Sequence, residues 1–162
     1  MKHVISVIVH NKPGVLSRVS GLFSRRGYNI ESLAVGETDN PELSRITIAV
    51  SGDESILEQI QKQLYKLIDV IKVIDLPKDS SVRRELVLVK VNTEKVNRAE
   101  IIQVADIFRG KIVDVGENNL TVEITGEEGK VEAFINMMSK FGIKELVRTG
   151  KIALHRGEKT VM

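Results

Sequence analysis

Apolar and polar positions in the first half of the chain follow strand and helix periods in turn. Residues 4–10 form an apolar, β-branched run that predicts a buried strand, and the turn-forming Asn11-Lys12-Pro13-Gly14 ends it. Further strands are predicted over residues 29–37, 44–51 and 70–76, which gives the order β-α-β-β-α-β. The two helices are marked by apolar residues at helical spacing: Val15, Leu16, Val19, Leu22 and Phe23, then Ile56, Leu57, Ile60 and Leu64.

The second half repeats this order. Strands are predicted over 85–91, 112–115, 120–124 and 145–154, and helices around Ile101–Phe108 and Val131–Met138. Arg26-Gly27 recurs as Arg109-Gly110, an offset of 83 residues, and Ser51-Gly52-Asp53 recurs as Thr125-Gly126-Glu127, an offset of 74. The second copy therefore has a shorter hairpin between its second and third strands.

Two copies of this order predict an α+β chain of two tandem ferredoxin-like βαββαβ domains. Each domain has an antiparallel sheet with its helices on one face. We place the first domain at residues 1–77, a polar linker at 78–83 and the second domain at 84–162. The strands are apolar at odd and even positions alike, so the helix-free face also needs a cover. We expect a homodimer, or docking of one half on the other.

Composition removes most catalytic classes. Among 162 residues there is no Cys and no Trp, and the three His have neither metal-ligand spacing nor a spaced carboxylate or serine partner. No phosphate-binding glycine motif follows a strand. A net charge of +2 and central strands without aromatic residues disfavour nucleic acid. No run is long enough to cross a membrane, and no signal-peptide pattern begins the chain. We therefore expect a cytoplasmic protein without a catalytic or metal site.

The turn Asn11-Lys12-Pro13-Gly14 is the strongest candidate for a binding site. It leads from a strand into a helix, whose free N–H groups at Gly14, Val15 and Leu16 would suit a carboxylate. Asn29 begins a strand that we expect to lie near, and the two Asn side chains could hold an amino acid. A plain turn before a helix is the alternative. The second copy has Glu94, Val96, Asn97 and Ile112 in place of Asn11, Pro13, Gly14 and Asn29, which favours a ligand.

The chain resembles an ACT domain and, more narrowly, the small regulatory subunit of acetolactate synthase (acetohydroxyacid synthase). The resemblance is carried by Asn11-x-Pro-Gly14-Val-Leu and by residues 16–33, 43–47, 57–64, 84–91 and 107–115. It extends over essentially residues 2–157.

The resemblance implies a non-catalytic subunit that dimerises through its ACT domains, binds and activates a large catalytic subunit, and confers feedback inhibition by valine. Thiamine diphosphate, Mg²⁺ and FAD would belong to the catalytic subunit, and this chain would carry no cofactor. The second half would mainly contact the catalytic subunit. A free-standing ACT sensor of another enzyme or of a transcription factor is the alternative. By the family's pattern the valine site would comprise Asn11, Gly14, Val15, Leu16, Asn29, Ile30, Leu33, Val35 and Gly36.

Overall fold

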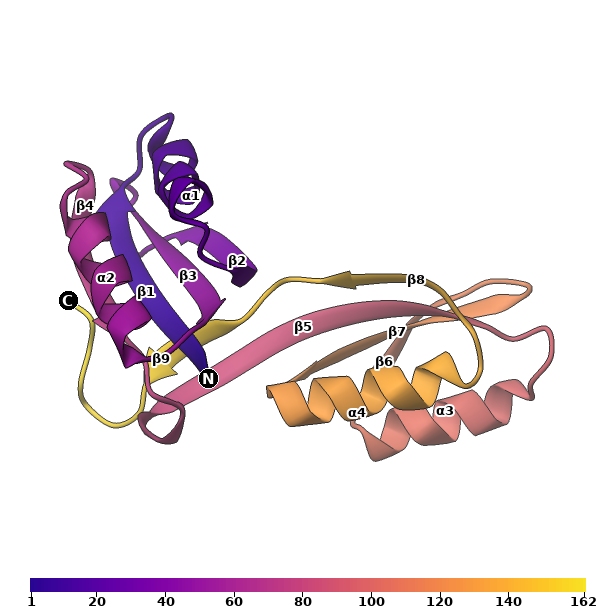
Figure 1. Cartoon of the computed structure of the whole chain (residues 1–162). Helices are drawn as coiled ribbons and strands as arrows, with labels where there is room; N and C mark the ends of the chain where they lie inside the picture. Colours follow the sequence, from indigo (N-terminus) through magenta and orange to yellow (C-terminus); the bar gives the residue numbers. More distant parts are fainter. The chain divides into compact units, whose positions relative to one another are not determined.

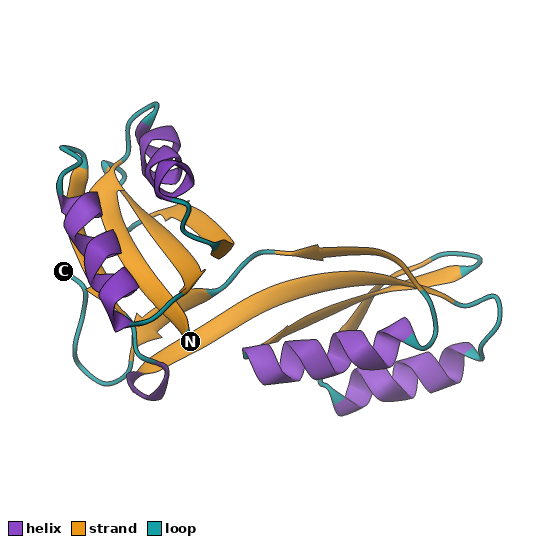
Figure 2. Cartoon of the chain, viewed as in Figure 1, coloured by secondary structure: helices purple, strands orange, loops and turns teal.

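A computed structural model describes all residues, 1–162, and the chain divides into two compact units. The first comprises Met1–Arg83 together with Gly150–Met162, and the second comprises Arg84–Thr149. Each unit has the predicted order of strands and helices, so the expected tandem ferredoxin-like fold is confirmed (Figures 1 and 2).

The first unit is a four-stranded antiparallel sheet with the strand order β2-β3-β1-β4. Its helices cover one face, and β2 and β4 are its edge strands. The elements are β1 (Lys2–His10), α1 (Val15–Arg26), β2 (Ile30–Glu37), β3 (Leu43–Ser51), α2 (Glu54–Tyr65) and β4 (Val70–Asp75).

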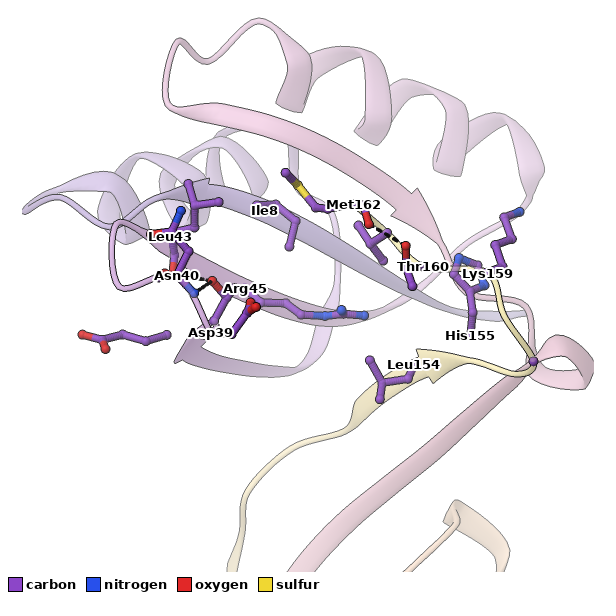
Figure 3. A pocket seen from close by; sticks show the side chains of 14 residues that line it. Ile8, Asp39, Asn40, Leu43, Arg45, Leu154, His155, Lys159, Thr160 and Met162 are labelled. Atoms are coloured by element: carbon purple, nitrogen blue, oxygen red, sulfur yellow. Dashed lines mark hydrogen bonds between the residues drawn. The ribbon is translucent and has the colours of Figure 1, made fainter.

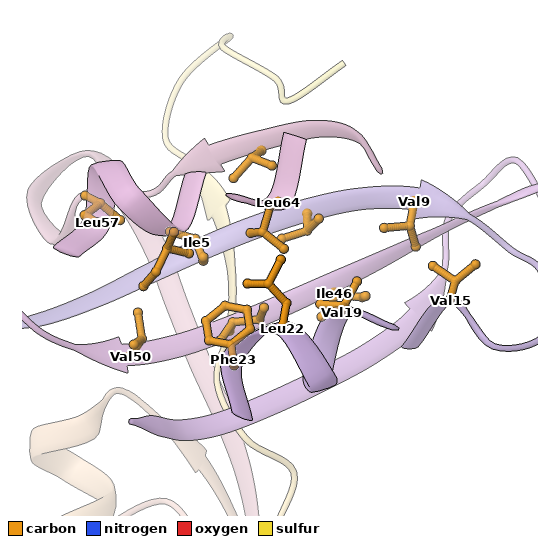
Figure 4. Close-up of a cluster of buried hydrophobic side chains, with 14 residues drawn as sticks. Ile5, Val9, Val15, Val19, Leu22, Phe23, Ile46, Val50, Leu57 and Leu64 are labelled. Carbon is orange, nitrogen blue, oxygen red and sulfur yellow. The ribbon is translucent and has the colours of Figure 1, made fainter. Parts of the chain in front are cut away.

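Alternate residues of the central strands form the core of this unit (Figure 4). Ile5 of β1 and Ile48 of β3 are cross-strand partners, and both are fully buried under the helices. The apolar helix positions found in the sequence supply the other side of this core, including Val19, Phe23 and Ile60. Burial of these side chains is the main stabilising term of a small domain.

Local signals place the helix ends. Asp53 caps α2, its carboxylate accepting the Ile56 N–H at 3.0 Å. Gly27 ends α1 in the left-handed conformation at φ 69°, and its N–H donates to the carbonyls of Phe23 and Ser24. Arg25 and Arg26 precede it, where positive charge favours the helix C-terminus.

The second unit repeats the architecture with the strand order β6-β7-β5-β8. Asn97 caps α3 by accepting the Ala99 N–H at 2.9 Å, and Phe108 packs edge-to-face on Phe134. The elements are β5 (Ser81–Asn92), α3 (Arg98–Ile107), β6 (Lys111–Val115), β7 (Asn119–Gly126), α4 (Glu128–Ser139) and β8 (Ile143–Arg148).

The end of the chain differs from the sequence-based expectation. The strand predicted over residues 145–154 is two strands, β8 and β9 (Ile152–His155), because Gly150 breaks it at φ 86°. Gly150–Met162, which we call the C-terminal segment, belongs to the first unit, although the sequence placed it in the second domain. The residues predicted as a linker contain a 3-10 turn, Lys78–Ser80, and β5 begins directly after it.

The C-terminal segment packs on the helix-free face of the first sheet. Ala153 is buried in a cluster with Val4, Ala49 and Leu76, which all lie on that face. The Arg45 Nη2 donates to the Ala153 carbonyl oxygen at 2.8 Å. The C-terminal segment therefore covers part of the helix-free face, where the strands carry apolar side chains.

Candidate functional site

The N-terminus of α1 presents backbone donors that the protein leaves without a partner. Gly14 occupies the cap position at φ 85°, and no side chain caps the helix. The N–H groups of Gly14, Leu16 and Ser17 have no backbone acceptor, whereas that of Val15 reaches the Lys12 carbonyl at 3.4 Å. Such donors at the positive end of a helix suit a carboxylate.

Asn11 directly follows β1, three residues before Gly14, and is held in place by three hydrogen bonds. Its Nδ2 donates to Glu37 Oε1 at 3.2 Å and to the Pro41 carbonyl at 3.0 Å. Its N–H donates to the Glu42 carbonyl at 2.7 Å. Both Nδ2 hydrogens are therefore used, and the Oδ1 of the exposed Asn11 remains an acceptor that receives no hydrogen bond from the chain.

Glu37 is a functional candidate that the sequence did not reveal. It ends β2, where its carboxylate holds the Asn11 amide. A carboxylate and an amide oxygen side by side can bind an ammonium group. Nothing in the sequence spacing connects residue 37 with residue 11, so only the pairing of strands exposes this relation.

Strand β2 carries the remaining predicted residues along a free edge, because it pairs with β3 alone. Ile30 and Leu33 are partly buried against the core, and they turn toward the helix side of the sheet. Val35 is 46% exposed, and Gly36 has no atom within 4 Å of the position where a Cβ would lie. An unpaired edge with an exposed apolar side chain is a surface that a further strand can cover.

The structure does not bring Asn29 near Asn11 within one chain, so that expectation was wrong. Glu37 pairs with Ser44 at one end of β3, beside Asn11, while Asn29 precedes Ile30, which pairs with Val50 at the other end. At roughly 3.3 Å per strand residue, the distance from residue 29 to residue 37 is about 26 Å. One chain therefore offers two separate halves of the predicted site.

A cavity of about 690 Å³ in the first unit contains none of the residues predicted from the sequence, although Glu37 lines it (Figure 3). It opens between the helix-free face, at Ile8 and Arg45, and the C-terminal segment, at Leu154 and Val161. Burial lowers the pKa of Arg45 below its ordinary value by desolvation. Acidic and basic side chains both line the rim, so the charges favour no single class of ligand.

The structure has neither a metal-binding cluster nor a helix that could span a membrane. It contains no group of three or more His, Cys, Asp or Glu side chains that could hold a metal ion. None of the helices has the length and apolar character needed to cross a bilayer.

Each half of the chain matches a known protein family. Residues 5–72 match the family described as the AHAS small subunit-like ACT domain. Residues 84–157 match the family described as the small subunit of acetolactate synthase.

Similar proteins match over nearly the whole chain. A probable acetolactate synthase small subunit of Archaeoglobus fulgidus is 55% identical, covering 98% of this chain and 99% of its own length. The acetolactate synthase small subunit of Mycolicibacterium smegmatis is 49% identical, and the match covers 98% of this chain and 94% of that protein. The acetolactate synthase small subunit from Thermotoga maritima, known from a crystal structure, is 46% identical in sequence, with a TM-score of 0.91. The match covers 98% of this chain and 99% of that chain. On this evidence the chain belongs to the family of acetolactate synthase small subunits, with an ACT domain in its first half.

Proposed function

We propose that this chain binds and activates the catalytic subunit of acetolactate synthase and makes that subunit sensitive to valine. The observation that supports this most strongly is the uncapped N-terminus of α1 beside Asn11 and Glu37, on a chain of this family. Thiamine diphosphate, Mg²⁺ and FAD would be held by the catalytic subunit.

The chemistry of the site fits an α-amino acid. The carboxylate would accept hydrogen bonds from the N–H groups of Gly14 and Leu16, and the ammonium would donate to Asn11 Oδ1 close to Glu37. A short branched side chain would pack against apolar residues of β2 such as Leu33 and Val35. One methylene changes binding in such a pocket by only about 1–3 kcal/mol, so valine, leucine and isoleucine would overlap.

A homodimer formed through β2 would unite the two halves of the site. If two β2 strands pair antiparallel with Leu33 opposite Leu33, Asn29 faces Glu37 of the partner subunit. The Asn29 side chain then reaches the neighbourhood of Asn11 across the interface, which removes the gap within one chain. The same pairing would cover Val35 and satisfy the free edge of β2.

Calorimetry on the purified chain tests the site. Titration of the chain with valine is expected to give a saturating heat signal. Asn29→Ile introduces the residue found at the corresponding position of the second half, Ile112, and is expected to abolish binding. Asn136→Ile is the matched control, because Asn136 is exposed on α4, outside the site. Unchanged binding in Asn29→Ile would contradict the assignment.

Co-purification tests the partner. A tagged copy of this chain should retain the catalytic subunit, and adding the chain to that subunit should raise acetolactate formation. Valine should then lower the raised activity. A chain that binds valine without retaining the catalytic subunit would instead be a free-standing sensor.

A further inference from the structure

The cavity of Figure 3 has one wall on the first sheet and the other on the C-terminal segment. Ile8 of β1 and Arg45 of β3 are cross-strand partners, and both line the cavity from the helix-free face. Leu154 and Val161 line it from the opposite wall. Both walls belong to the first unit. The volume of about 690 Å³ is of the size that takes a small organic molecule.

Arg45 is a half-buried cation that no carboxylate neutralises. Its side chain extends from β3 toward the C-terminal segment, where Nη2 donates to the Ala153 carbonyl oxygen at 2.8 Å (Figure 3). No Asp or Glu forms an ion pair with it. Desolvation lowers its pKa, and no nearby charge counteracts this loss of hydration. An anion in the cavity would supply the missing partner, and a carboxylate matches the planar fork of a guanidinium.

The other charged side chains at the cavity act more weakly than Arg45. Glu37, Asp39 and Lys159 are exposed, so water and salt screen their charges. His155 also lines the cavity, and its Nε2 is buried without a hydrogen-bond partner. Buried polar atoms in folded proteins usually have such a partner, and a carboxylate would accept a hydrogen bond from a protonated Nε2. The buried polar groups of the cavity, a guanidinium and an imidazole, therefore both suit a carboxylate.

Aliphatic side chains form most of the remaining lining. They come from both walls: Ile8, Leu43, Leu154, Val161 and Met162. Moving one methylene group of a ligand from water into such surroundings raises its affinity about fourfold. The lining thus fits a hydrocarbon chain next to the anion site at Arg45.

We propose that this cavity binds an aliphatic carboxylate, with the head group on Arg45 and the chain against Leu43, Leu154 and Val161. The inference goes beyond the proposed function and does not rest on it, because the cavity contains neither Asn11 nor the N–H groups at the start of α1. A ligand that contacts both walls holds the C-terminal segment on the sheet. It also stabilises the first unit, because it binds the folded state alone.

Calorimetry with octanoate on the full chain tests the head group and the chain. Octanoate should bind at one site per chain. 1-Octanol lacks the charge and should bind at least about tenfold more weakly, whereas acetate lacks the chain and should give no saturating signal. Octylammonium carries the opposite charge and should not bind. Equal affinities for octanoate and octylammonium, or an octanoate dissociation constant above about 1 mM, would overturn the proposal.

Two variants on β9 (Ile152–His155) locate the site without disturbing the core. Leu154→Glu adds a carboxylate to the cavity wall and should weaken octanoate binding at least about tenfold, through lost apolar contact and charge repulsion. Ile152→Glu is the matched control, because Ile152 is on the same strand and does not line the cavity. Their side chains are 62% and 56% exposed, so both variants should fold. The site assignment fails if the two variants bind octanoate equally well.

Substitutions of Arg45 test the charge. Arg45→Gln should lower octanoate affinity at least about tenfold and leave 1-octanol affinity unchanged, whereas Arg45→Lys keeps the charge and should lose less. Retained 1-octanol binding shows that the cavity is intact although the contact with Ala153 is altered. Octanoate affinity in Arg45→Gln equal to that of the unmodified chain would overturn the proposal.

Competition with valine separates this site from the amino-acid site. Saturating valine should leave octanoate bound, because the two ligands would occupy different places on the first unit. Displacement of octanoate by valine would overturn the second site. Octanoate binding to a chain that does not bind valine would support the cavity while the proposed function failed.

Discussion

The Nδ2 of Asn11 donates to the Oε1 of Glu37 at 3.2 Å, which joins the end of β1 to the end of β2. This hydrogen bond uses one Nδ2 hydrogen of Asn11, and the Oδ1 of Asn11 accepts no hydrogen bond, three residues before the uncapped start of α1 at Gly14. In the proposed site, the Glu37 carboxylate would lie near the ammonium group of a bound amino acid.

Replacing Glu37 with Ala should weaken valine binding. The variant loses the nearby negative charge and frees the Asn11 amide to rotate, and one such interaction is typically worth about 1 kcal/mol. This corresponds to an affinity roughly fivefold lower, measurable by calorimetry. Glu42→Ala is the control, because Glu42 is exposed nearby and only its carbonyl contacts Asn11. Equal affinities in the two variants would argue against a role for the Glu37 carboxylate.

Gly14→Ala should lower both stability and valine binding. Gly14 is at φ 85°, and an added Cβ would lie 3.0 Å from the Arg18 guanidinium, which is paired with Asp69. Left-handed conformation at a non-glycine residue costs about 1–2 kcal/mol, which urea unfolding can measure. Gly27→Ala, at φ 69° with nothing within 4 Å, should lose comparable stability but keep its valine affinity. The hypothesis of a site at Gly14 fails if both variants bind valine normally.

Ala153→Glu should destabilise the first unit, because it buries a carboxylate among Val4, Ala49 and Leu76. An unpaired charge in an apolar cluster should reduce the free energy of unfolding by about 3 kcal/mol. Leu154→Glu is the adjacent control, since Leu154 is 62% exposed and should tolerate the change within about 0.5 kcal/mol. Comparable thermal unfolding of the two variants would show that the segment does not cover the sheet in solution.

Asp75 should make the protein less stable as the pH rises from acid toward neutral. Desolvation by burial raises the pKa of its carboxyl above 3.8, although His3 and Arg83 act in the opposite direction. Because the folded pKa is the higher one, the contribution of Asp75 to stability is fully present below pH 3.8 and is lost as the pH rises through the folded pKa.

Asp75→Asn should remove this dependence. The variant should gain stability relative to the unmodified chain as the pH increases from about 3.5 to 6, as measured by urea unfolding at each pH. Asp79→Asn provides the comparison, since Asp79 is exposed in the turn before β5. A difference between Asp75→Asn and the unmodified chain that stays constant over this range would contradict the assignment.

Much of the fold could be read from the sequence because its signals act over short distances. Helical spacing of apolar residues, the Asp53 cap and the left-handed Gly27 each depend on a few neighbouring residues. The same is true of the Asn11–Gly14 turn, whose free N–H groups follow from a helix start without a cap. The second copy lacks the Asn11, Gly14 and Asn29 pattern, which favours a binding site in the first half.

The positions of Asn29, Glu37 and the C-terminal segment depend on contacts between distant parts of the chain. Strand register separates Asn29 from Asn11 and brings Glu37 to it. The contact between Arg45 and Ala153 joins residues 108 positions apart. No local pattern distinguishes one such partner from another, because many pairings satisfy the same alternation of apolar and polar residues. The order of elements and the family are thus encoded locally, whereas the division of the site into two halves and the packing of the C-terminal segment on the first sheet arise from tertiary contacts.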